Sequence, residues 1–306
     1  MRITILGSAA GGGFPQWNCN CRNCKGVRSG AINTKSRTQS SIFIQADSGY
    51  EGVLFNTSPD ILEQIRSHPT LQPARSLRDT AIAGVVLMDG QIDHATGLFM
   101  LRERDSKLPL WCTDPVKEDL SQGNPVLRVL EYYCGVEQHR IALDGSWFTV
   151  PGVADLRFQA LPLSSKAAPY SPHRDNSVPG DNIGITIHDQ RSGKIVFYAP
   201  GLGDITPAVF EALGRADAVM VDGTFWTDDE MPKMGLSAKR AREIGHLPQS
   251  GAGGMIEWMA KLPSTTQRYL IHINNTNPIL DEDSPERAIL TLAGIQVCED
   301  NMSIKL

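Results

Sequence analysis

The sequence of 306 residues has no long apolar segment, no internal repeat and no low-complexity tract. None of its apolar runs approaches the roughly 20 residues that a membrane-spanning helix needs, which argues against a role that requires crossing a bilayer. It also lacks an excess of positive charge, since 29 Lys and Arg against 34 Asp and Glu give a formal net charge of −5. A basic surface for nucleic acid or for an anionic membrane is therefore not expected.

A secretory leader is not expected either. The first apolar segment, Arg2–Leu6, is short and runs directly into the glycine-rich segment Gly7–Gly13, whereas a signal peptide needs a longer apolar region. We therefore expect a cytoplasmic protein that acts on a small molecule, with no nucleic-acid or membrane partner. A homodimer is compatible with the sequence. In a reducing compartment, the six cysteines are expected to be metal ligands or buried thiols and not disulfides.

Short apolar segments rich in Val, Ile, Leu and Phe alternate with polar or glycine-rich turns, which is typical of strands. Helical segments lie between several of them. The pattern predicts an α+β fold, with two packed sheets covered by helices on their outer faces, in a single domain over residues 1–306. The expected strands are Arg2–Leu6, Ser41–Gln45, Gly52–Asn56, Gly84–Met88, Gly184–His188, Lys194–Ala199, Ala218–Asp222 and Tyr269–Ile273. The expected helices are one with Ser58 as its N-cap, then Ala95–Arg104, Ala208–Leu213, Ala238–Ile244 and Met255–Lys261.

Polar residues follow the ends of four expected strands. They lie at Asn56–Ser58, Asp89–His94, Asp222–Thr224 and His272–Asn275. Loops that meet at one edge of a sheet sandwich commonly build a catalytic or binding site, so we expect these four segments to converge. The long segment Ser165–Asn182 is expected to be a lid or a binding loop.

Three cysteines stand close together in the segment Trp17–Cys24, at Cys19, Cys21 and Cys24. Tight turns can aim all three sulfurs at one ion, and zinc binds such thiols as thiolates. The alternative is three free loop thiols, an arrangement that invites oxidation. A fourth ligand is needed to close a tetrahedron, and His246 is the expected one. With four protein ligands the zinc would be structural, because no position stays open for a substrate.

A second group of candidate ligands is Asp93, His94 and His272. Asp93 and His94 stand where a strand gives way to a helix, and His272 stands at the end of a late strand. Each has an ordinary alternative, because Asp-His pairs also cap helices and lone histidines are often structural. Together they form a set of two histidines and one carboxylate, which leaves open positions on an iron-type ion and suits oxygen chemistry.

The strand that leads into Asp89-Gly90-Gln91-Ile92-Asp93-His94, followed by a helix and by the late strand ending in His272, resembles the metallo-β-lactamase superfamily. This resemblance covers nearly the whole chain and implies an αββα sandwich with a metal site at one edge of the two sheets. Leu6–Ala9, the three cysteines and Arg37–Ser41 are most similar to the phosphodiesterase and ribonuclease Z branch.

The sequence departs from the superfamily pattern at one of the two metal positions. Asp89 and Gln91 stand where the first two histidines of the HxHxDH motif belong, and no histidine occurs around Ser164, where a third would stand. Gly201 replaces the bridging aspartate, although Asp204 is near. Hydrolases of this kind use two ions to generate hydroxide and hold the leaving group, so two-metal hydrolysis is not expected here.

Four longer strings narrow the resemblance to the family of pyrroloquinoline quinone (PQQ) biosynthesis B proteins. They are Gly7–Cys21, Gln91–His94, Tyr170–Arg174 and His272–Leu280. This family resemblance implies iron-dependent hydroxylation of the tyrosine ring in a cross-linked Glu–Tyr precursor. The alternatives are a carrier that helps to move PQQ or its precursor to the periplasm, and a zinc hydrolase that has kept one ion. The native metal stays open, because the same ligands accept zinc, manganese or copper.

A substrate rich in carboxylates requires cationic and amide donors near the metal. The candidates are Arg37, His173, Arg174, Asn274 and Asn275, each of which could instead be a solvated or structural residue. Asp89, Gln91 and Asp222 are expected to hydrogen-bond the metal ligands or bound water.

Overall fold

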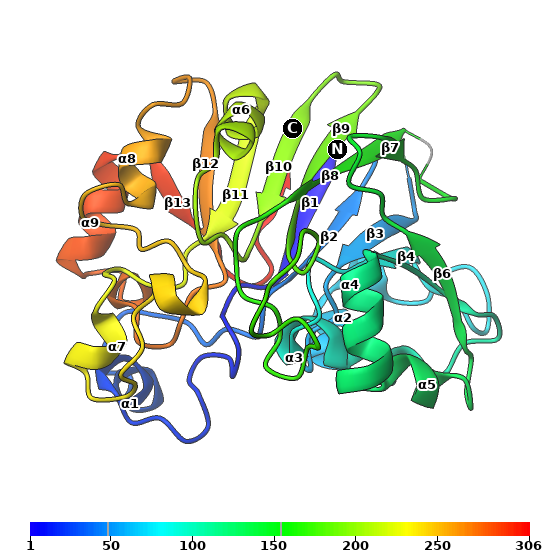
Figure 1. Cartoon of the computed structure of the whole chain (residues 1–306), viewed down its shortest axis with the longest axis horizontal. Helices are drawn as coiled ribbons and strands as arrows, with labels where there is room; N and C mark the ends of the chain where they lie inside the picture. Colours follow the sequence, from blue (N-terminus) through cyan, green and yellow to red (C-terminus); the bar gives the residue numbers. More distant parts are fainter. Residues whose placement is uncertain (48, 154) are drawn as a thin grey trace.

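The computed structural model describes residues 1–47, 49–153 and 155–306. Within them, two mixed sheets of seven strands each face one another, with helices on the outside (Figure 1). The first sheet has the order β14-β1-β2-β3-β4-β5-β6 and the second β13-β12-β11-β10-β9-β8-β7. The strands are β1 (Arg2–Gly7), β2 (Ser41–Gln45), β3 (Gly52–Phe55), β4 (Ile82–Val86), β5 (Leu108–Cys112), β6 (Val136–Arg140), β7 (Trp147–Phe148), β8 (Leu156–Pro162), β9 (Ile183–Asp189), β10 (Ile195–Ala199), β11 (Ala218–Asp222), β12 (Gln267–Ile271), β13 (Ile295–Val297) and β14 (Ser303–Lys305).

The inner faces of the two sheets share one apolar core. Ile3 and Ile5 alternate along β1 and contribute to it from the first sheet, while Phe158 and Tyr198 contribute from the second. The ring of Phe55 lies 5.8 Å from both Phe158 and Tyr198, measured between centroids. Each fully buried side chain of this size contributes about 1.5–3 kcal/mol to folding, so the sandwich is held mainly by apolar burial between its sheets.

Helices cover the outer face of each sheet, which confirms the predicted αββα sandwich (Figure 1). Apolar residues of α2, η2, α4 and α5 pack on the first sheet, and those of α6, α8 and α9 pack on the second. The helices are α1 (Arg22–Ser29), α2 (Ile61–Ser67), η1 (Pro69–Leu71), α3 (Ile92–Ala95), η2 (Thr96–Leu101), α4 (Asp114–Glu118), η3 (Asp119–Gly123), α5 (Val126–Leu130), α6 (Pro207–Arg215), α7 (Glu230–Lys233), η4 (Arg242–Ile244), α8 (Met255–Met259), η5 (Pro278–Leu280) and α9 (Pro285–Leu292). In this described part of the chain, no helix has both the length and the apolar character to span a bilayer.

All eight predicted strands are present, shifted by at most two residues at either end. Three helix predictions were wrong in detail. The expected helix Ala95–Arg104 is instead the 3-10 helix η2, Thr96–Leu101, which directly follows the short helix α3. Helix α2 begins at Ile61 with Asp60 at its N-cap, and Ser58 instead accepts a hydrogen bond from the Asp60 backbone N–H, 3.2 Å away. The expected helix Ala238–Ile244 is reduced to the single turn η4, because Asp228 accepts the backbone N–H of Arg242 at 3.1 Å and holds this segment as a loop.

The four polar segments that follow strand ends lie at the same edge of the sandwich. The backbone N–H of Thr57 donates to the carbonyl of His94 at 2.7 Å, and that of Asn274 donates to Thr224 at 3.1 Å. Strands β10, β11 and β12 are parallel, so the loops after them leave from one side. The predicted convergence is confirmed, and this edge carries the side chains described next.

Candidate metal centres

Asp93, His94 and His272 come together at the end of the sandwich. The Oδ2 atom of Asp93 lies 3.2 Å from His272 Nε2 and 3.7 Å from His94 Nε2. One potential ligand atom from each of the three residues lies within 4.8 Å of the other two. His94 and His272 are 178 positions apart along the chain. The segments that follow β4 and β12 bring them together.

Asp89 fixes the orientation of the His94 ring. Both of its carboxylate oxygens lie 2.8 Å from His94 Nδ1, so this nitrogen carries the proton and donates it. The opposite nitrogen, Nε2, is buried and has no hydrogen-bond partner among the described residues. Burial lowers the pKa of His94, but the Asp89 and Asp93 carboxylates outweigh it and raise the pKa to about 9. An unpartnered buried nitrogen beside a carboxylate is what a divalent cation would satisfy.

The backbone and side chain of His272 are both held by Thr224. His272 has a φ of +61°, a conformation that is uncommon outside glycine and concentrates at functional sites. The Thr224 hydroxyl lies 2.9 Å from the His272 carbonyl and 2.9 Å from its Nδ1. This contact leaves His272 Nε2 facing Asp93. The sequence pointed to Asp222 in the segment Asp222–Thr224 but not to Thr224.

His246 does not complete the cysteine cluster, and its assignment as the fourth zinc ligand was wrong. It lies instead against Asp222, with its Nδ1 2.6 Å from Oδ2 of that carboxylate, and its ring stacks on His272 at 5.6 Å between centroids. Burial lowers the pKa of His246, but the adjacent Asp222 outweighs it and raises the pKa. His246 is far from the cysteines along the chain, and a histidine at the end of an expected helix gives no local signal of which of these two places it reaches.

Asp222 is the second carboxylate of this edge, and its acceptor sites are already filled. Its Oδ1 accepts the Thr224 backbone N–H at 2.8 Å and the Thr224 hydroxyl at 2.5 Å. Its Oδ2 accepts the Leu202 backbone N–H at 2.9 Å in addition to His246. Asp222, His246 and His272 also have ligand atoms within 4.8 Å of one another. Because Asp222 is saturated, the Asp93–His94–His272 set is the better place for an ion.

The three cysteines do form a cluster, with their sulfurs within 4.8 Å of one another. Cys21 is the N-cap of α1, and its sulfur accepts the backbone N–H of Cys24. The side-chain amide of Asn275 points at the same place, with Nδ2 3.1 Å from the sulfur of Cys19 and 3.3 Å from that of Cys24. Asn275 was expected to contact substrate, and the structure places it with the cysteines instead.

A cavity of about 270 Å³ opens over the Asp93–His94–His272 set. It is lined by Gln91, Arg174 and Asn274, as the sequence predicted, and by Thr224 and His246. Five residues of the long segment Ser165–Asn182 line it as well, namely Ser165, Lys166, Pro169, Arg174 and Asn182. The segment contains neither a helix nor a strand, and its position over the ligands agrees with the predicted binding loop.

Arg37 and His173 are not at this cavity, and the structure corrects both assignments. Arg37 is only 3% exposed and donates to the carbonyl of Cys298, with Glu299 3.8 Å away. His173 is held between Asp181, at 3.1 Å, and Glu118, at 3.2 Å. Both residues are occupied by internal ion pairs, which a sequence motif cannot reveal.

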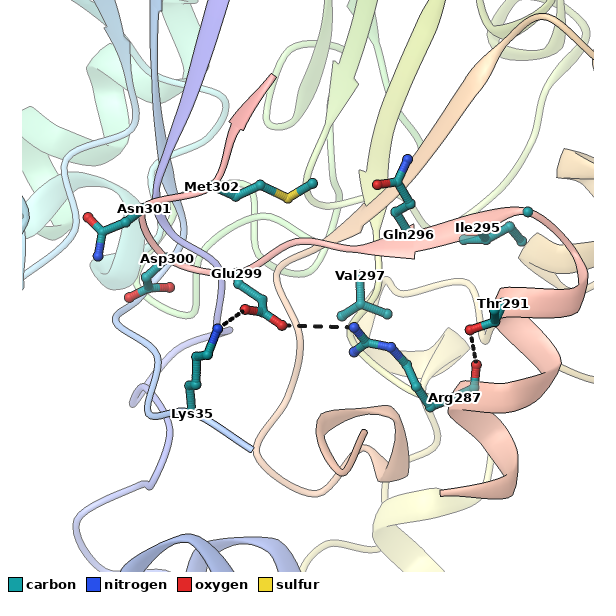
Figure 2. Close-up of a pocket in the computed structure, with 11 residues that line it drawn as sticks. Lys35, Arg287, Thr291, Ile295, Gln296, Val297, Glu299, Asp300, Asn301 and Met302 are labelled. Atoms are coloured by element: carbon teal, nitrogen blue, oxygen red, sulfur yellow. Dashed lines mark hydrogen bonds and ion pairs between the residues drawn. The ribbon is translucent and has the colours of Figure 1, made fainter. Parts of the chain in front are cut away.

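A larger cavity, of about 670 Å³, lies elsewhere, beside α9 and β13 (Figure 2). Its cations are matched by its own carboxylate, because Glu299 lies 2.9 Å from Lys35 and 3.9 Å from Arg287. It holds no cluster of potential metal ligands among the residues that the structure describes. Size alone therefore does not mark the functional site, and the smaller cavity is the better candidate.

The αββα sandwich and the ligand cluster at its edge define a protein of the metallo-β-lactamase class. Residues 52–273 match the family model described as a beta-lactamase superfamily domain. The chain is 59% identical over 306 residues to coenzyme PQQ synthesis protein B of Azoarcus sp. (strain BH72), with both chains covered completely. It is 58% identical over 307 residues to the protein of the same name from Methylobacillus flagellatus, again over 100% of both chains.

The crystal structure of Zn²⁺-bound PqqB from Methylobacterium extorquens superimposes on this chain with a TM-score of 0.91 and 34% sequence identity, covering 100% of both chains. The chain belongs to the coenzyme PQQ synthesis protein B family.

Proposed function

We propose that this protein hydroxylates the tyrosine ring of the cross-linked Glu–Tyr precursor during PQQ biosynthesis, with Fe²⁺ held by Asp93, His94 and His272. The observation that carries the proposal is the open ligand set, in which the buried His94 Nε2 has no hydrogen-bond partner among the described residues. Two histidines and one carboxylate, with a cavity beside them, are the donor set of non-haem iron oxygenases. Iron, when bound, supplies the activation of dioxygen.

Neighbouring residues of the protein orient the two histidine ligands. Asp89 keeps the His94 proton on Nδ1, and Thr224 keeps His272 Nε2 directed at Asp93. Supporting contacts of this kind typically strengthen metal binding by 10–100-fold. The cavity walls include the apolar side chains of Phe225, Ile244 and Pro169, which would pack against an aromatic ring and exclude water from it.

Arg174 and Asn274 are the polar groups of the cavity that would contact the tyrosyl half of the substrate. Arg174 forms no ion pair within the described ranges, and its guanidinium donates to the carbonyl of Ala167. The amide of Asn274 donates to the Thr276 hydroxyl at 2.5 Å, and its oxygen has no hydrogen-bond donor among the described residues. A carboxylate and an ammonium group are the matching partners.

For the cysteine cluster we propose structural zinc, with Asn275 in the fourth position in place of His246. The Asn275 amide already contacts two of the three sulfurs within 3.3 Å, and a half-turn of that amide would present its oxygen to the ion. Three thiolates and one further protein ligand would leave no open position, which is the pattern of a structural site.

The decisive test is dioxygen uptake by Fe²⁺-loaded protein when the cross-linked diamino acid is added, with ascorbate as reductant. Uptake should coincide with a gain of oxygen atoms in the product, measured by mass spectrometry. The His94→Ala variant should lose both signals. A matched control is His139→Ala, because His139 stacks on Trp111 at 4.1 Å and lines no part of the metal cavity.

Two other functions would give different results. Tight binding of the quinone product without dioxygen uptake under any metal would favour the carrier. Hydrolysis of phosphodiesters or esters by the zinc-loaded protein would favour a one-metal hydrolase.

A further inference from the structure

A groove of about 560 Å³ adjoins the metal cavity and has no role in the function proposed above. One wall is formed by the end of β8 and the start of the long loop, from Pro162 to Lys166, together with Ser177, Val178 and Pro179. The opposite wall is formed by Gly203, Asp204, Arg242 and Gly245. Ser165 and Lys166 line both the groove and the metal cavity, so the two spaces meet at these residues.

The walls of the groove are held together by direct hydrogen bonds. The Ser165 hydroxyl donates to the carbonyl of Gly245 at 2.9 Å, and the Gly203 backbone N–H donates to the carbonyl of Ser164 at 3.1 Å. Gly245 has a φ of +90°, and a Cβ atom there would lie 2.5 Å from the Ser165 Oγ. A side chain at Gly245 is therefore excluded on two grounds, and the groove is a preformed feature.

The place where the two spaces meet is fixed through the backbone of Lys166. Its carbonyl accepts the side-chain amide of Asn182 at 3.1 Å and that of Gln91 at 3.4 Å. The Lys166 side chain is exposed and has no ion-pair partner among the described residues. The metal cavity alone, at about 270 Å³, is smaller than the ~300–1,000 Å³ typical of small-molecule sites. With the groove added, the space falls well within that range.

The charged side chains of the groove are unpaired, unlike those of the cavity beside α9 and β13. Lys166, Arg242 and Asp204 form no ion pair in the parts of the chain that the structure describes; Asp204 accepts one hydrogen bond, from the backbone N–H of Ile205 at 2.8 Å. In the cavity of Figure 2, by contrast, Glu299 lies between Lys35 and Arg287 and pairs with both. Two free cations and one free carboxylate on facing walls suit a ligand with two carboxylates and one ammonium group.

We propose that this groove binds the glutamyl half of the cross-linked substrate, which carries two carboxylates and one ammonium group. Lys166 and Arg242 pair with the carboxylates, and Asp204 pairs with the ammonium group. The tyrosine ring then enters the adjoining cavity, toward Asp93, His94 and His272. This inference rests on the proposed function, because it takes the substrate from it, and it adds specificity-determining residues for that substrate.

The test measures binding apart from turnover. Zinc-loaded protein is titrated calorimetrically, without dioxygen, with the cross-linked Glu–Tyr diamino acid and with the same compound methylated on both glutamyl carboxylates. Lys166→Met and Arg242→Met should each raise the Kd for the diamino acid about tenfold, and Asp204→Asn about threefold. The methyl ester should bind the unsubstituted protein weakly and respond little to the first two substitutions. Lys239→Met, which removes an exposed lysine outside both spaces, is the matched control.

Two results overturn the inference, and they are distinguishable. If the unsubstituted protein binds the diamino acid and both methionine variants bind it as the Lys239→Met control does, the groove has no part in recognition and the proposed function stands. If the unsubstituted protein fails to bind the diamino acid at millimolar concentration, the proposed function fails and the groove assignment fails with it.

Discussion

The cysteine cluster and the Asp93–His94–His272 set are two groups of potential metal ligands with opposite surroundings. The sulfurs lie at the start of α1, where the side chain of Asn275 occupies the remaining side. The Asp/His set instead faces a cavity and leaves His94 Nε2 without a partner among the described residues. A closed set can only stabilise, whereas an open set can bind a substrate. Substitutions in the two sets should therefore separate stability from activity.

The largest effect is expected for Asp93→Asn. This substitution keeps the size of the side chain but removes the one carboxylate of the open set. Turnover and metal content at the Asp/His set should fall more than about 100-fold, beyond the loss typical for a supporting contact. Elemental analysis should still find one zinc per chain at the cysteines. Loss of both metals together would contradict the separation of the two sites.

The second effect is expected for Cys24→Ser, at a fully buried sulfur. Loss of a structural zinc should lower the free energy of unfolding by about 3 kcal/mol or more. Denaturant unfolding with parallel zinc analysis measures this change. Cys134→Ser is the control, because Cys134 belongs to no ligand cluster in the described residues. Equal stability of the two variants would argue that the cysteines hold no structural ion.

A smaller effect is expected for Asp89→Asn. The amide can no longer hold the His94 proton on Nδ1 as a carboxylate does, so metal affinity at the open set should fall about 10–100-fold. Competition with a chromophoric chelator measures the affinity. The exposed surface residue Asp105 offers the control Asp105→Asn, whose affinity should equal that of the unsubstituted protein.

A pH dependence of stability is expected from Glu230, which contacts the loop shared by the two sites. Burial raises the pKa of Glu230 from 4.5 to about 7, so the folded protein holds a proton that the unfolded chain releases. The free energy of unfolding should fall as the pH rises from about 4.5 to 7, by about 2–3 kcal/mol. Glu230→Gln should remove this part of the pH dependence in denaturant titrations at several pH values. An unchanged profile would show that Glu230 does not titrate in this range.

The sequence predicted the sandwich because most of its strands are continuous apolar segments. Strand β6, by contrast, is largely exposed at the edge of its sheet and contains Glu137, Gln138, His139 and Arg140. Its sequence therefore has no apolar pattern that would indicate a strand. Strands β13 and β14 have only three residues each, too few to show a period. Edge and very short strands are formed by pairing with a neighbour, which a local pattern does not contain.

Only part of the candidate site could be predicted from the sequence. Polar residues after strand ends located Asp93, His94 and His272, because parallel strands place such residues at one edge. The partners of His246 and Arg37 could not be predicted, since both depend on contacts with distant segments. Thr224 gave no signal, because a hydroxyl after a strand is ordinary until its contact with His272 is known.

The loop from His272 to Asn277 supplies a residue to each ligand group, since His272 belongs to one and Asn275 contacts the other. Between them, Thr276 donates a hydrogen bond to Glu230, and Asn277 holds the carbonyl of Gly223 at 2.9 Å. The two ligand groups are therefore connected through one short loop. An insertion or deletion in this loop would displace residues of both ligand groups at once.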